Sequence, residues 1–176
     1  IRDEAFAVIL ADDLLDGKVP VMKQMVDKYQ HYRSSILGVE KISPEQSKSY
    51  GVIDGKLFDE RIYKLSGIVE KPAPADAPSN MGVVGRYILS SRIFDHIKTI
   101  KPGAGGELQL TDAIQSLLSQ EQVLAYEYEG VRYDCGSKLG YLQATVAYAL
   151  AHPQLGADFH RHLKNVVKTP AKSRRK

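Results

Sequence analysis

Hydrophobic residues recur along the chain in short strand-like runs that alternate with helical stripes. A continuous apolar run at 5–11 predicts a strand buried on both faces, which is typical of parallel sheets. Residues 21–32 carry apolar side chains at helical spacing, with Pro20 just before them, and predict an amphipathic helix. Another strand is expected at 35–42, followed by a turn or short helical turn at 43–46.

The middle of the chain predicts a hairpin, because an Asp-Gly step separates two strand-like runs. We expect strands at 50–54 and 57–70, with the turn at Gly55–Lys56. A proline-rich loop follows at 73–79. The remaining expected elements are strands at 82–89 and 123–128, and helices at 92–98 (capped by Ser90), 110–118, 138–151 and 153–167.

This mixture of strands and helices predicts an α/β fold with a mixed sheet and helices packed on its faces. The length of 176 residues fits one domain, and no linker divides it. We therefore expect a single domain over 1–167 and a basic tail over 168–176.

The charge pattern argues against a nucleic-acid-binding protein. The net charge is only +3, and part of it lies in the basic tail. Without that tail the chain is near neutral, so we expect no nucleic-acid partner, and the tail is typical of a solvated end.

Cysteine content and hydropathy indicate the compartment. Cys135 is the only cysteine, which excludes an intramolecular disulfide and fits a reducing environment, so we expect a cytoplasmic protein. No apolar run approaches the ~20 residues that a membrane span needs, and we expect no membrane partner. The chain begins without Met and without a signal peptide, and we expect it to be a piece of a longer one.

The segment 67–72, Gly-Ile-Val-Glu-Lys-Pro, is the strongest candidate for a binding site. Glu70 and Lys71 stand side by side where Pro72 ends an apolar run, and a turn there would bring both head groups to one ligand. A carboxylate accepts hydrogen bonds from sugar hydroxyls, and a lysine neutralises a phosphate. The pair suits a phosphorylated sugar; the alternative is a solvated ion pair at a strand end.

Two acids are candidate metal ligands. Asp12 ends the first apolar run, where carboxylates hold Mg²⁺ in α/β sheets, although it would equally cap a turn. Asp134 precedes Gly136, and it or Ser137 would equally cap the helix that follows.

Several segments, in this order, carry a family resemblance: LADD, YGVIDG, GIVEKP, MGVVGRYILS, GELQLTDAI and DCGSKLGY. From about residue 6 to residue 163 the chain resembles the bacterial UTP–glucose-1-phosphate uridylyltransferases, a branch of the sugar-phosphate nucleotidylyltransferases. The resemblance implies a Rossmann-like nucleotidyltransferase fold. It also implies the conversion of UTP and glucose 1-phosphate to UDP-glucose and pyrophosphate, with Mg²⁺ as cofactor.

The resemblance also implies roles for individual residues. Asp12 and Asp134 match the acids that lie at the metal, and Lys71 matches the lysine that meets the sugar phosphate, which makes Lys71 and Asp12 the expected catalytic residues. The expected substrate-binding residues are Gly51, Glu70, Lys71, Val84 and Gly85.

One departure from the family pattern is large. The family's Gly-rich loop with Arg and Lys, which cradles the triphosphate, has no counterpart here, and neither do the base-reading segments. We expect the chain to correspond to the C-terminal part of such an enzyme and to be weak or inactive alone. The alternatives are a non-catalytic regulatory subunit of the same fold, or an enzyme that uses dTTP or CTP. The resemblance also implies a homo-oligomer built partly with the C-terminal helices.

Overall fold

The computed structural model describes residues 4–103 and 106–168. Two compact units divide the chain, Ile1–Arg132 and Tyr133–Lys176, and each is described by itself. The expected boundary at 167/168 stays a prediction, because residues 169–176 of the expected tail lie outside the described residues.

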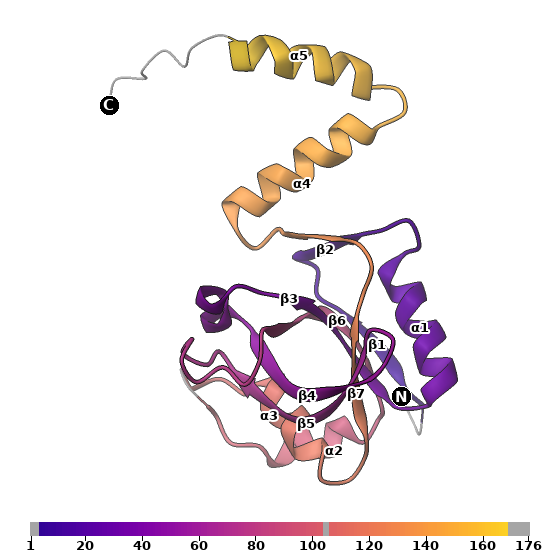
Figure 1. Ribbon diagram of the computed structural model, residues 1–176, viewed down its shortest axis with the longest axis vertical. Helices are drawn as coiled ribbons and strands as arrows, with labels where there is room; N and C mark the ends of the chain where they lie inside the picture. The colour runs from indigo at the N-terminus through magenta and orange to yellow at the C-terminus, as the bar shows by residue number, and fades with distance from the viewer. Residues whose placement is uncertain (1–3, 104–105, 169–176) are drawn as a thin grey trace. The chain divides into compact units, whose positions relative to one another are not determined.

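Among the described residues, a six-stranded sheet in the order β1-β6-β3-β7-β5-β4 forms the centre of the first unit (Figure 1). β3 and β7 run parallel, and the other neighbours are antiparallel, so the expected mixed sheet is confirmed. A further pairing of Val52 with Gly82 joins β4 to β6. The strands are β1 (Phe6–Ile9), β3 (Ser35–Lys41), β4 (Gly51–Asp59), β5 (Ile62–Glu70), β6 (Met81–Leu89) and β7 (Val123–Glu127).

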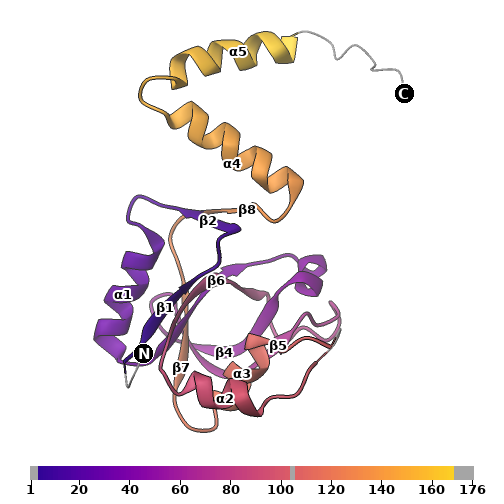
Figure 2. The ribbon, with the colours of Figure 1, turned by 180° about the vertical axis from the view of Figure 1, so that it is seen from behind.

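Helices cover both faces of this sheet (Figures 1 and 2). α1 (Val21–Tyr32) has the bounds that its apolar spacing predicts, and it buries Val21 and Met25 against one face. α2 (Ile93–Thr99) and α3 (Leu110–Leu117) pack on the other face. The central strand β3 places Ile36 in the core under α1 and Leu37 in the core under α2 and α3, as the alternation of side chains along a strand requires.

The first strand differs from its prediction. β1 lies at the edge of the sheet and is antiparallel to β6, rather than buried in a parallel arrangement. Its side chains alternate between half-buried and exposed, and Ile9 is 57% exposed. An apolar strand is buried on both faces only where other elements cover both faces. Among the described residues, one face of β1 is left uncovered.

The hairpin also differs from its prediction. β4 continues through Gly55, where the register shifts in a β-bulge, and the chain turns at Asp59–Arg61 instead. A Cβ at Gly55 would lie 2.9 Å from the Lys64 carbonyl oxygen, so the bulge needs a glycine there. The Asp-Gly step therefore marks a bulge, and Arg61, with φ 59°, makes the turn.

The chain also forms shorter elements. The 3₁₀ helix η1 (Pro44–Ser49) confirms the second of the two alternatives at 43–46, a short helical turn, and extends it to Ser49. The small strands β2 (Asp13–Asp16) and β8 (Val131–Asp134) pair with each other; neither was expected. The expected Ser90 cap is wrong: Arg92 occupies the N-cap of α2 without a side-chain hydrogen bond, and the Ser90 hydroxyl donates to Glu121.

The second unit is a pair of helices, α4 (Lys138–Ala151) and α5 (Gly156–Lys168). Ser137 caps α4 by accepting a hydrogen bond from the Gly140 N–H at 3.0 Å. In the described part of the chain, none of the helices combines the length and the apolar character that a membrane span requires.

Candidate functional site

Glu70 and Lys71 lie together at the end of β5. Lys71 adopts the left-handed conformation, with φ 46°, and its N–H donates to the Tyr50 carbonyl at 3.0 Å. This turn places the Lys71 ammonium 3.4 Å from a Glu70 carboxylate oxygen. A non-glycine residue in this conformation is uncommon and recurs at functional sites. The lysine side chain is about half exposed, so its charge remains available to a ligand.

Helix α3 fixes the other oxygen of Glu70. The Thr111 hydroxyl donates to it at 2.6 Å. Gly51, opposite Glu70 in the β4–β5 ladder, packs against both: an added Cβ would lie 3.1 Å from the Thr111 hydroxyl oxygen and 3.3 Å from the Glu70 carboxylate. The structure therefore brings together three residues that were expected to share a site, Gly51, Glu70 and Lys71.

A second group forms where β6 meets the turn after β1. The buried Asp13 carboxylate accepts a hydrogen bond from the Gly85 N–H at 2.7 Å. A Cβ on Gly85 would lie 2.7 Å from that carboxylate oxygen, so packing alone demands glycine here. The Val84 side chain is buried in the core under α1, which leaves only its backbone for a ligand. The ligand roles expected for Val84 and Gly85 stay predictions.

Arg132 joins these two groups. Its guanidinium donates to Asp13 at 2.5 Å, to the Tyr50 hydroxyl at 2.9 Å and to Glu40 at 3.2 Å. Burial acts to lower the pKa of Arg132, but the hydrogen bonds to Tyr50 and Asp13 outweigh it and raise the pKa, so the guanidinium stays charged. The Tyr128 hydroxyl donates to the other Glu40 oxygen at 2.6 Å, and burial with this bond raises the pKa of Tyr128.

Asp12 is exposed beside the buried Asp13. Its carboxylate forms no hydrogen bond or ion pair with any residue that the structure describes, so its oxygens are free for a cation. The described residues contain no group of three or more His, Cys, Asp or Glu side chains that would hold a metal ion by themselves. Such a setting fits Mg²⁺, which is usually held by one or two carboxylates and completes its shell with water and phosphate oxygens. Asp13 does not fit that role, because both of its oxygens are engaged.

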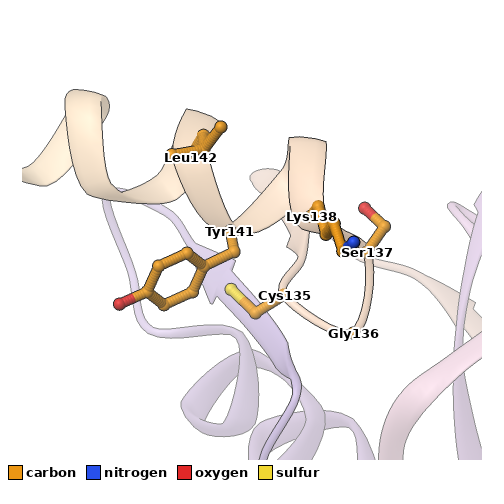
Figure 3. Close-up of a pocket in the computed structure, with 6 residues that line it drawn as sticks. All are labelled: Cys135, Gly136, Ser137, Lys138, Tyr141 and Leu142. Atoms are coloured by element: carbon orange, nitrogen blue, oxygen red, sulfur yellow. The ribbon is translucent and has the colours of Figure 1, made fainter. Parts of the chain in front are cut away.

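Asp134 belongs to the second unit. One of its carboxylate oxygens accepts from the Gly136 N–H at 3.1 Å, and its carbonyl accepts from the Ser137 hydroxyl at 3.0 Å. The turn before α4 thus uses Asp134 and Ser137 together, as the capping alternative proposed. A hollow on the first turn of α4 is lined by Cys135, Gly136, Ser137, Lys138, Tyr141 and Leu142 (Figure 3).

The sequence did not single out Arg132, Tyr50 or Thr111 for this site. The burial of Arg132 is not visible in the sequence, because the four residues of β8 are too few to show a strand period. Nothing in the pattern marks the hydroxyls of Tyr50 and Thr111, since their partners are distant in sequence.

The profile of the nucleotidyl transferase family, described as "Nucleotidyl transferase", matches residues 1–150. The chain belongs to this family. Its relatives within the family include the UTP–glucose-1-phosphate uridylyltransferase of Staphylococcus epidermidis, which is 42% identical over 94% of this chain and 58% of its own length. The corresponding Pseudomonas aeruginosa enzyme is 48% identical over 82% of this chain and 53% of its own length.

Solved structures of family members agree with the fold. A UDP-glucose pyrophosphorylase complexed with UDP-glucose has a TM-score of 0.83 at 44% identity, over 86% of this chain and 58% of that one. A UTP-bound enzyme from Acinetobacter baumannii has a TM-score of 0.81 at 37% identity, over 92% of this chain and 56% of that one. The nucleotidyltransferase fold expected from the sequence is confirmed. The chain spans little more than half the length of these relatives.

Proposed function

We propose that this chain carries the sugar-phosphate side of a UTP–glucose-1-phosphate uridylyltransferase, which makes UDP-glucose and pyrophosphate from UTP and glucose 1-phosphate. The observation that carries the proposal is the Glu70–Lys71 pair, turned to one place beside Gly51. Relatives at 42–48% identity that bear the name of this activity support it.

The residue types suit this ligand. A Glu70 carboxylate oriented by Thr111 would accept hydrogen bonds from sugar hydroxyls, and the ammonium of Lys71 would neutralise the phosphate. Gly51 has no side chain to block the approach of the sugar ring. The backbone at Val84 and Gly85 would line the same ligand.

The reaction needs positioning more than proton transfer. The phosphate oxygen of glucose 1-phosphate attacks the α-phosphorus of UTP, and pyrophosphate leaves. Because the nucleophile is already an anion, no general base is required, and catalysis is alignment together with charge neutralisation. Lys71 would hold the attacking phosphate in line.

We propose that Asp12 is a ligand of Mg²⁺, and the role expected for Asp134 at the metal stays a prediction. The support is the free, exposed carboxylate of Asp12 and the preference of Mg²⁺ for carboxylate and phosphate oxygens. When bound, the ion would offset the negative charge of the reacting phosphates.

A homo-oligomer and a cytoplasmic location belong to the same proposal. Exposed apolar side chains along α4, among them Leu139 and Leu142 at 67% and 59% exposure, support contact with a second copy. A single cysteine supports a reducing compartment.

Titration calorimetry with glucose 1-phosphate and with UDP-glucose tests the proposal. We expect the 176-residue chain to bind both. We expect Lys71→Met and Glu70→Gln each to raise the dissociation constant for glucose 1-phosphate by about tenfold, since each removes a charged contact. Lys48→Met, which removes an exposed lysine paired with Glu45, is the matched control and should bind normally.

Failure of the unaltered chain to bind either ligand would contradict the proposal and favour a regulatory subunit of the same fold. We expect little or no UDP-glucose synthesis by this polypeptide alone, and synthesis at a normal enzymatic rate would contradict that expectation.

A further inference from the structure

Arg132 is a buried charged residue to which the proposed reaction assigns no task. Its side chain is 9% exposed. It donates to Asp13 at the start of β2, to Glu40 in β3 and to Tyr50 just before β4, so one guanidinium connects three separate elements. Its carbon Cζ also lies 4.9 Å from the centre of the Tyr50 ring. The guanidinium therefore donates hydrogen bonds through its N–H groups and also lies near the Tyr50 ring.

The partners of Arg132 are the immediate supports of the proposed sugar-phosphate site. Asp13 follows Asp12, and its second oxygen holds the Gly85 N–H at 2.7 Å. Tyr50 precedes Gly51, and its carbonyl accepts the N–H of Lys71 at 3.0 Å. Arg132 is thus one residue removed from four of the positions expected to meet ligand or metal.

Net stability does not explain the ionic arrangement around Arg132. Asp13 and Glu40 carry two negative charges beside Arg132, and the neighbouring Arg86 donates to the carbonyls of Leu10, Asp13 and Gly85. Buried ion pairs give little net stability compared with apolar side chains of similar volume. What the ionic network does provide is fixed geometry between strand ends, because a guanidinium fork holds its partners in set directions.

We propose that Arg132 is a positioning residue for the sugar-phosphate site, which sets the places of Gly51 and Lys71 through Tyr50 and that of Gly85 through Asp13. This inference rests on the proposed function. It assigns Arg132 no contact with the substrate.

Glucose 1-phosphate affinity of Arg132 variants tests this inference. Arg132→Met removes the charge and all three hydrogen bonds, and we expect the dissociation constant to rise by about tenfold. Arg132→Lys keeps the charge but lacks the planar fork, so it should recover only part of the affinity. Arg161→Met, on the exposed face of α5 where Arg161 pairs with Asp158, is the matched control and should bind normally.

A second readout separates positioning from loss of folding. In ¹⁵N-labelled protein, at a temperature where circular dichroism shows the variant folded, Arg132→Met should shift the amide signals of Gly51 and Gly85 but leave that of Gly67 in place. Tyr50→Phe removes one hydroxyl and should lower the affinity several-fold without unfolding. If Arg132→Met does not fold, Tyr50→Phe decides: normal affinity overturns the inference.

The outcomes distinguish this inference from the proposed function. An unaltered chain that does not bind glucose 1-phosphate contradicts the proposed function and removes the inference with it. Binding by the unaltered chain together with equal affinity in folded Arg132→Met overturns the inference alone.

Discussion

Asp12 and Asp13 are neighbours in the sequence with opposite environments. Asp13 is buried, holds the Gly85 N–H and pairs with Arg132, whereas Asp12 is exposed and its carboxylate is free among the described residues. Adjacent carboxylates thus divide into one that builds the site and one that is available to a cation. Each residue's surroundings, rather than its type, set that difference.

Tyr87 in β6 makes stability depend on pH in the alkaline range. Burial, with the negative charges of Asp13 and Glu70, raises its pKa from 10.0 to about 12. Below pH 10 the phenol is protonated in both the folded and the unfolded chain. Between pH 10 and about 12 the unfolded chain releases the proton first, so the free energy of unfolding falls as pH rises.

We expect Tyr87→Phe to remove this loss, which is about 2 kcal/mol over the interval. Urea unfolding at pH 9 and at pH 11.5 measures it, with Tyr141→Phe as a control because Tyr141 is 60% exposed. An equal alkaline loss in the Tyr87 variant and the unaltered chain would show that another group is responsible.

At the scale of elements, α3 acts as a support for the end of β5. Thr111 fixes the carboxylate of Glu70, and the Gln115 side-chain oxygen accepts the N–H of Ile68 at 2.7 Å. Ile114 and Leu117 are buried in the core beneath. The amphipathic pattern of α3 therefore brings two polar side chains onto the strand that carries the proposed binding pair.

Removal of the Thr111 hydroxyl should weaken sugar binding. We expect Thr111→Val to raise the dissociation constant for glucose 1-phosphate several-fold, since Glu70 loses a hydrogen bond that orients it, and Thr111→Ser to restore most of the affinity. Calorimetry measures both. Thr145→Val is the control, because the Thr145 hydroxyl donates to the Tyr141 carbonyl within α4. Unchanged affinity in Thr111→Val would mean that Glu70 needs no such support.

Elements with strong periodicity could be predicted from the sequence, and short or ambiguous ones could not. α1 and α4 have the expected bounds because each runs for twelve or more residues, and in α1 the apolar side chains also recur at helical spacing. β2 and β8, with four residues each, are too short to show a period. The step at Asp54–Gly55 was misread because a tight turn and a bulge both favour glycine.

The candidate site divides along similar lines. Site residues that are adjacent in the sequence, such as Glu70 and Lys71, could be found because their side chains together suggest a ligand. The supports of the site could not, since Arg132 reaches partners that are 82 to 119 positions away. Such contacts exist only once the strands have paired.

At the scale of the whole molecule, the second unit displays much apolar surface. Leu142, Val146 and Leu150 line an almost wholly apolar hollow along α4. The proposed contact between two copies would bury such a surface.

We therefore expect the chain to associate at micromolar concentration and Leu142→Glu to shift it toward the monomer, because a carboxylate would be desolvated in the contact. Sedimentation velocity over a range of concentrations measures this shift. Leu57→Glu, at a 67% exposed leucine of β4, should leave the distribution unchanged. A Leu142→Glu chain that associates as strongly as the unaltered chain would place the contact elsewhere.

The left-handed backbone at Lys71 has a consequence for natural variation. A side chain in that conformation costs about 1 kcal/mol that glycine would avoid. Drift toward glycine at this position would ease folding, and the proposed need for the ammonium group would oppose it. At position 71, stability thus favours glycine, whereas the proposed ligand contact favours lysine.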